Sequence, residues 1–161
     1  MKYSLLPALC LALLFTGCTA DSAPAYDPGR FACTLAIDSV STGESGYFLA
    51  EYVRADGGVC LTVTAPERLA GLSFTFSESG CVMDAAGIAV PLSEDAAASL
   101  AGLAALLGEN PEDASERKKT ADGTLYFFPT GQLLLDSAGF PVSAETTDGR
   151  RAAVTGLSPV Q

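Results

Sequence analysis

The chain has 161 residues, a formal net charge of −10 and neither histidine nor tryptophan. Its acidic balance argues against nucleic acid and against an anionic membrane surface as direct partners, because both attract lysine and arginine. Without histidine it lacks the commonest general base and the usual zinc ligand. No C-x-x-C, P-loop or G-x-S-x-G pattern is present. We therefore expect no catalytic residues, metal or cofactor, and a protein that is not an enzyme.

The first 17 residues are typical of a bacterial lipoprotein signal peptide. Lys2 gives the positive start, residues 5–15 form a short apolar run, and Gly17 is the small residue before Cys18. The run is well below the roughly 20 residues of a membrane-spanning helix, so a retained transmembrane anchor is the weaker interpretation. We expect residues 1–17 to be removed and Cys18 to be lipidated, which would anchor the protein to the extracytoplasmic face of a cell membrane. Residues 18–30 then form a flexible tether, and residues 31–161 form one domain.

Period-two patterns predict six strands in the first half of the domain. They cover residues 31–37, 47–54, 59–64, 72–77, 81–85 and 88–92. Asp56-Gly57 predicts a tight hairpin that sets Tyr52 opposite Leu61 and Ala50 opposite Val63. A proline loop over residues 65–71 interrupts the strands and ends at Gly71, which we expect to be a sharp turn.

The period then changes to that of a helix. Ser93 is a plausible N-cap, and a leucine stripe over residues 100–107 is ended by Gly108. Residues 110–119, acidic first and basic last, predict a second, exposed short helix. Four more strands follow at 124–128, 132–136, 140–146 and 150–156. The expected class is mainly β (α+β): a curved antiparallel sheet or unclosed barrel of about ten strands, with a helical insertion covering one face.

This order of elements resembles the LolA/LolB-type lipoprotein-carrier superfamily. The run at 63–74, V-T-A-P-E-R-L-A-G-L-S-F, is similar to the strand, proline loop, glycine and strand of lipoprotein members in Gram-positive bacteria, and 122–127 with 139–141 fits the closing hairpins. The resemblance implies an unclosed half-barrel whose apolar concave face is covered by helices. Its soluble carriers begin with an amphipathic helix and latch their lid with a sheet arginine. Here a strand comes first, and neither Arg54 nor Arg68 is matched to that latch, so we do not expect shuttling of lipoproteins.

Two functions follow as hypotheses. In the first, the anchored protein holds a lipid or other apolar ligand in the concave sheet, since large apolar residues recur at alternating positions; any one of them could instead only fill a core. The candidate ligand-binding residues are Phe48, Tyr52, Phe74, Phe76, Leu103, Leu107, Phe127 and Phe128. In the second, an interaction lipoprotein binds and stabilises another envelope or spore-surface protein without a ligand. A collapsed cavity favours the second, and co-purified lipid favours the first.

The three cysteines of the domain are expected to stay unbridged. A meander places Cys33 opposite about Arg54 and Cys60 opposite about Val53, which puts the two thiols on opposite faces of the sheet. They are also two strands apart, roughly 9 to 10 Å, beyond the roughly 7 Å limit of a disulfide. Cys81 falls beside the strand that contains Phe76. Curvature of the sheet leaves a pairing of Cys33 with Cys81 open.

Overall fold

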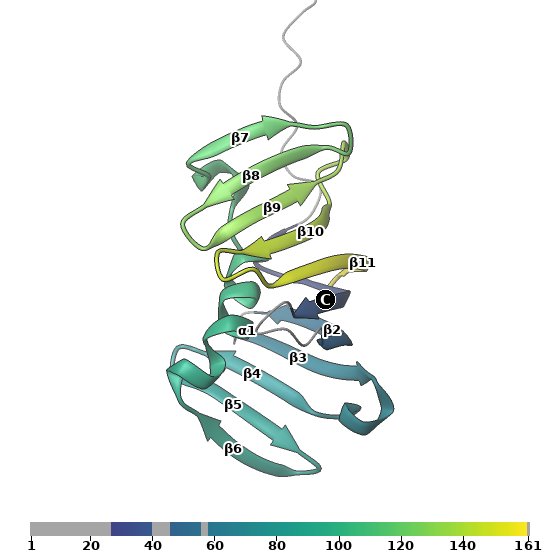
Figure 1. Ribbon diagram of the computed structural model, residues 1–161, viewed down its shortest axis with the longest axis vertical. Helices are drawn as coiled ribbons and strands as arrows, with labels where there is room; N and C mark the ends of the chain where they lie inside the picture. The colour runs from purple at the N-terminus through teal and green to yellow at the C-terminus, as the bar shows by residue number, and fades with distance from the viewer. Residues whose placement is uncertain (1–26, 40–45, 56–57, 161) are drawn as a thin grey trace, which may run out of the picture.

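The computed structural model describes residues 27–39, 46–55 and 58–160. Within them, eleven strands form a single antiparallel sheet that is not closed into a barrel (Figure 1). The strands are β1 (Phe31–Ser39), β2 (Gly46–Ala55), β3 (Gly58–Ala65), β4 (Ser73–Ser77), β5 (Gly80–Ala85), β6 (Ile88–Leu92), β7 (Glu116–Lys119), β8 (Thr124–Phe128), β9 (Gly131–Leu135), β10 (Pro141–Thr146) and β11 (Arg151–Pro159). The mainly β, open-sheet class expected from the sequence is confirmed.

The sheet consists of two meanders joined at its centre. Its order is β6-β5-β4-β3-β2-β1-β11-β10-β9-β8-β7, so the first and last of the described strands are neighbours. The two edges, β6 and β7, are connected by α1 (Glu94–Leu106) and the short 3-10 helix η2 (Pro111–Asp113). Because the connection runs from one edge of the sheet to the other, α1 must cross one face of it (Figure 1). We call that face concave and the opposite face outer.

The helix begins and ends where the sequence indicates. The Ser93 hydroxyl accepts a hydrogen bond from the Ala96 N–H at 3.3 Å, as an N-cap does, and Glu94 and Asp95 lie in the first turn. The regular helix ends at Leu106, just before Gly108. No helix in the described ranges is long and apolar enough to cross a bilayer.

The pairing of the first strands confirms the predicted hairpin register. Tyr52 pairs with Leu61, Ala50 with Val63 and Val53 with Cys60. The Asp56-Gly57 turn itself lies outside the described residues, as do Cys18 and the signal segment. Residues 27–30, expected to belong to the tether, instead form a turn in which the Arg30 N–H donates to the Asp27 carbonyl at 3.1 Å.

The three cysteines are free thiols, as predicted. Cys33 pairs with Tyr52 rather than with Arg54, a difference of two residues that leaves its side chain on the same face. Cys33 therefore points to the concave face and Cys60 to the outer face. Cys81 pairs with Phe76 and lies on the concave side, one strand beyond β4.

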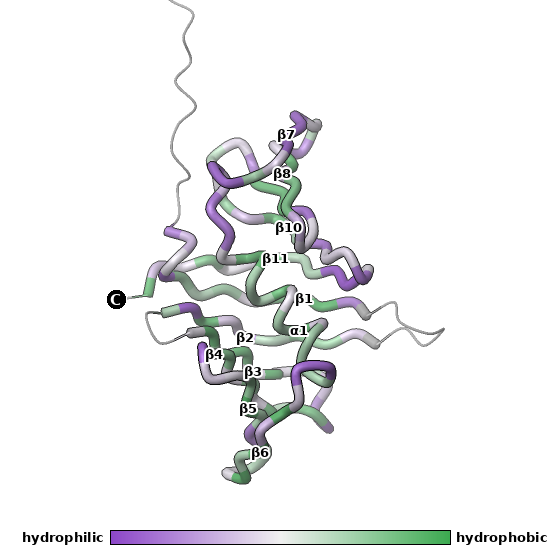
Figure 2. The backbone as a smooth tube through the Cα atoms, turned by 90° about the vertical axis from the view of Figure 1, so that its left-hand side faces the viewer, coloured by the Kyte–Doolittle hydropathy of each residue, from purple (hydrophilic) through white to green (hydrophobic). Residues whose placement is uncertain are grey.

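The predicted second helix at 110–119 is wrong. Only Pro111–Asp113 is helical, and Glu116–Lys119 forms strand β7, which pairs with β8. The segment has no apolar stripe that a helix could bury, whereas β8 offers it a row of backbone hydrogen-bond partners. The sheet thus has eleven described strands rather than ten. Its β7 edge is strongly hydrophilic (Figure 2), because the strand consists of one glutamate, one arginine and two lysines. Such an edge discourages pairing with another chain; at the other edge, Pro91 in β6 has no N–H to donate.

The proline loop is confirmed. β3 ends at Ala65, the 3-10 helix η1 (Glu67–Leu69) follows, and Gly71 has φ +85°. The Gly71 N–H donates to the Val63 carbonyl at 2.9 Å, and the Val63 N–H donates to the Leu72 carbonyl at 2.8 Å. The loop therefore closes on β3 before β4 begins.

Candidate functional site

The concave face is covered in the middle by α1. The helix buries Leu103, Leu106 and the adjacent Leu107 completely. Beneath them lie fully buried sheet residues, namely Leu35, Ile37, Tyr52, Leu61 and Leu133. The centre of the half-barrel is thus a packed core rather than an open cavity.

Strand β2 supplies polar groups that hold the C-terminal end of α1. The Tyr52 hydroxyl donates to the Ala104 carbonyl at 3.0 Å, and the Arg54 guanidinium donates to the same oxygen at 3.2 Å. Carbonyls in the last turn of a helix have no partner within the helix, and a cation there also complements the helix dipole. Since the last turn of α1 has no basic residue of its own, Arg54 provides this charge from the sheet.

Gly108 makes room for that arginine. A Cβ atom at Gly108 would lie 2.1 Å from the Arg54 Cζ and Nη1 atoms. The contact between Arg54 on the sheet and the Ala104 carbonyl of α1 was not predicted from the sequence. Arg68, by contrast, is exposed on η1.

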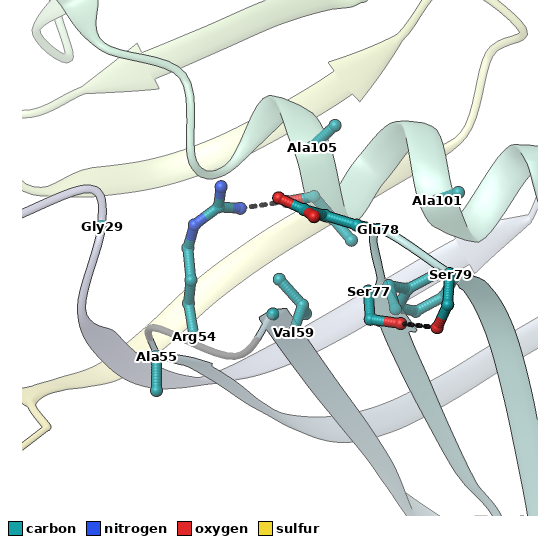
Figure 3. A pocket seen from close by; sticks show the side chains of 12 residues that line it. Gly29, Arg54, Ala55, Val59, Ser77, Glu78, Ser79, Ala101 and Ala105 are labelled. Atoms are coloured by element: carbon teal, nitrogen blue, oxygen red, sulfur yellow. Dashed lines mark hydrogen bonds between the residues drawn. The ribbon is translucent and has the colours of Figure 1, made fainter.

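Two pockets lie on either side of α1. The larger, about 820 Å³, is lined by Arg54, Val59, Phe76, Glu78 and the alanines of the C-terminal half of α1, with Gly29, Ala55, Gly58, Ser77 and Ser79. Figure 3 shows the Arg54 and Glu78 side chains projecting into it, and the Ser77 and Ser79 hydroxyls hydrogen-bonded at 2.8 Å. The smaller, about 240 Å³, is lined by Phe48, Val63, Leu69, Leu72, Phe74, Ala96, Ser99, Leu100 and Arg150.

The eight candidate ligand-binding residues separate into three groups. Tyr52, Leu103 and Leu107 are fully buried, and Phe128 is nearly so, which makes them core residues. Phe127 lies on the outer face, because it pairs with Gln132 while Leu133, the next residue, is in the core. Three candidates are half-buried on the concave face and line the two pockets beside α1: Phe48 and Phe74 the smaller one, and Phe76 the larger. Phe127 and Phe128 line a different hollow, of about 300 Å³.

Burial shifts two titratable groups beneath the helix. It raises the pKa of Tyr52 to about 12, against an opposing hydrogen bond from Arg54. It likewise raises the pKa of the Cys33 thiol to about 12. Both groups are therefore neutral at physiological pH, and Cys33 is an inert thiol rather than a nucleophile.

Sequence reasoning missed the groups on the other side of α1. The Ser99 hydroxyl donates to the Asp148 carboxylate at 2.5 Å, and the Thr146 hydroxyl donates to its other oxygen. These two bonds, that of Ser99 foremost, lower the pKa of Asp148. Asp148 lies between the two strands predicted at 140–146 and 150–156, but its partner on α1 is 49 residues away and no local pattern connects them.

Arg150 is the second missed residue. It is half-buried, it lines the smaller pocket, and its Nε atom is buried without a hydrogen-bond partner among the described residues. Among all the residues that the structure describes, no group of three or more His, Cys, Asp or Glu side chains is arranged to hold a metal ion.

No protein-family model and no curated protein sequence matches this chain. Among solved structures it is similar to LolA superfamily protein NE2245 from Nitrosomonas europaea, with 8% identity, 84% of this chain and 88% of that chain covered, and a TM-score of 0.45. It is also similar to a domain from Vibrio parahaemolyticus proposed to belong to an outer membrane lipoprotein-sorting protein, with 10% identity, 82% and 86% covered, and a TM-score of 0.42. Both are similarities in overall chain path at very low sequence identity. They concern the fold alone and say nothing of the ligand.

Proposed function

We propose that this protein is a membrane-anchored lipoprotein that binds a lipid or another apolar ligand on the concave face of its half-barrel, without catalysing a reaction. The observation that carries the proposal is the set of half-buried aromatic residues beside α1: Phe48, Phe74 and Phe76. Aromatic side chains that line hollows on the face of a sheet, rather than filling its core, are typical of apolar binding sites. Cys18 would supply the membrane anchor, on the signal-like pattern of residues 1–18.

Mass spectrometry tests this function. The chain from Thr19 onward contains every described helix and strand; it is purified without detergent, sprayed under native conditions, and its organic extract is analysed. We expect an adduct of lipid mass that the double variant Phe48→Ser/Phe74→Ser largely loses. The matched control is Phe127→Ser, because Phe127 lies on the outer face. Absence of any adduct, or equal loss in the control, would contradict ligand binding on the concave face.

A second candidate function is binding of another envelope protein. It is supported by the filled centre of the concave face and by two exposed apolar side chains on the concave side of β6, Ile88 and Val90, which are 67% and 41% exposed. A patch of this kind is a common protein contact surface. Chemical crosslinking in cells tests this function. A specific crosslinked species that is lost with Ile88→Lys, but is kept with Val53→Lys on the outer face, would favour it.

A further inference from the structure

We propose that the smaller pocket binds an amphiphile with an anionic head group, and that Arg150 recognises the head while the aromatic wall holds the alkyl chain. The inference rests on the proposed ligand-binding function and adds to it the chemical class of the ligand. The shared chemistry is a carboxylate or phosphate attached to a hydrocarbon chain.

The walls of the pocket suit an alkyl chain. Phe48, Leu72 and Phe74 come from the sheet and its proline loop, and Leu100 comes from α1. Arg150 is the single charged residue among those that line the pocket, and no carboxylate does so. An apolar hollow with one cation at its wall complements a molecule that has one anionic end.

The guanidinium of Arg150 is short of partners. Its Nε atom is buried and makes no hydrogen bond, and its side chain forms no ion pair closer than 4 Å within the described ranges. The neighbouring Asp148 carboxylate attracts the Arg150 charge, but the hydrogen bonds it accepts come from Ser99, Thr146 and the Arg150 backbone N–H rather than from the guanidinium. A buried donor without an acceptor is costly, and an anionic oxygen placed beside it removes that cost.

The larger pocket lacks this combination. Its arginine, Arg54, already donates to the Ala104 carbonyl, and the carboxylate of Glu78 also lines it and would repel an anion. The smaller pocket, at about 240 Å³, lies just below the range of about 300–1,000 Å³ common for small-molecule sites. It therefore fits a single alkyl chain better than the body of a two-chain lipid.

The test uses the full chain in phosphatidylcholine nanodiscs and two photoreactive probes. One is dodecanoic acid with a diazirine at the end of its chain, and the other is the matching dodecanol. The variant is Arg150→Gln, which keeps the hydrogen bonds that the backbone of residue 150 makes with the Thr146 N–H and hydroxyl in the turn. The control is Arg151→Gln, which removes the same charge one residue away, where the side chain is 63% exposed and pairs with Glu145 on the outer face.

We expect the acid to label residues of the smaller pocket and the labelling to fall at least about tenfold in Arg150→Gln, the range for a hydrogen bond to a charged group. Labelling should change less than about twofold in Arg151→Gln, and the alcohol should label all three proteins alike. Comparing each probe across the variants cancels its partition into the bilayer. Competition by unlabelled dodecanoate or by lysophosphatidylglycerol then identifies a free acid or a lipid head group as the source of the charge.

Acid and alcohol that label the wild-type pocket equally would overturn the inference and leave apolar ligand binding intact; this comparison also decides the matter if Arg150→Gln does not fold. Equal loss in both arginine variants would overturn it as well, since it would reflect net charge rather than a contact. Absence of labelling by both probes would overturn the inference and the proposed function together.

Discussion

Replacing Gly108 with alanine tests how α1 is held on the sheet. The new Cβ atom would lie 2.1 Å from two atoms of the Arg54 guanidinium and 2.6 Å from its Nε, so the guanidinium has to move. Gly108 does not have a positive φ, and the substitution therefore adds no backbone strain. The expected effect comes through Arg54 alone.

The magnitude follows from the contacts that Arg54 gives up. It loses its bond to the Ala104 carbonyl, worth about 0.5–1.5 kcal/mol, and part of its interaction with the helix dipole, worth about 0.3–1 kcal/mol. The carbonyl itself keeps the Tyr52 hydroxyl and is not left unsatisfied. We expect Gly108→Ala to lower the free energy of unfolding by about 1–2 kcal/mol.

Gly102→Ala is the matched control, with the opposite sign. Gly102 lies inside α1, and a Cβ atom there meets only the Thr146 methyl group at 3.8 Å, an ordinary contact. Alanine in place of an interior helix glycine stabilises by about 0.5–1 kcal/mol.

Urea unfolding of both variants, in the wild type and in an Arg54→Met background, completes a double-mutant cycle. If displacement of Arg54 is the cause, Gly108→Ala should cost less than about 0.3 kcal/mol once Arg54 is gone. An undiminished cost in the Arg54→Met background would refute the contact. Gly102→Ala should be unaffected by the background.

Four further outcomes are expected. Gly71→Val should destabilise by about 1–3 kcal/mol through strain at φ +85°, since no atom lies near its Cβ, and Gly71→Asn should cost less; an unchanged urea midpoint for valine would remove the claim. Burial raises the pKa of Cys33 from 9.0 to about 12. The stability that the protonated thiol contributes is therefore intact below pH 9.0 and is lost as the pH rises toward 12. The fall in unfolding free energy over this pH range, measured by urea unfolding, should be smaller in Cys33→Ala. Hydrogen bonds, first that of Ser99, lower the pKa of Asp148 below 3.8. The stability that the Asp148 carboxylate contributes is therefore present above pH 3.8 and is lost as the pH falls below it. Ser99→Ala should lose less stability than the wild type on acidification, and an equal loss would count against the bond between Ser99 and Asp148. Globomycin should cause the unprocessed form to accumulate if Cys18 is lipidated, and normal processing would rule this out.

The fold was predictable wherever local pattern and register agree. Alternation fixes which side chains share a face, and a two-residue turn fixes which residues pair, so Tyr52 opposite Leu61 follows from the sequence. The helix prediction was wrong for residues 116–119. The order of their charges favours a helix terminus, but the free edge of β8, which no local pattern reveals, favours a strand.

The site was harder to predict than the fold. Alternation places Phe48, Phe74 and Phe76 on the concave face, but it cannot tell a pocket wall from a core, which depends on where α1 comes to rest. Tyr52 and Leu103 were thus indistinguishable from them by pattern. Arg150 carried no signal at all, because its position beside Phe48 and Phe74 results from the pairing of strands at opposite ends of the chain.

The pairing of β1 with β11 also constrains how the protein is made. Until β11 leaves the ribosome, one edge of β1 has no hydrogen-bonding partner. The meander of β1 to β6 then has β1 as an open edge strand, with Leu35 and Ile37, which are buried in the complete fold. The mature edges carry lysines or a proline, but the temporary one has neither along its nine residues. A chain truncated before β11 should therefore aggregate rather than fold into a smaller sheet, and a protein that crosses a membrane before it folds would need its nascent β1 kept apart from other copies.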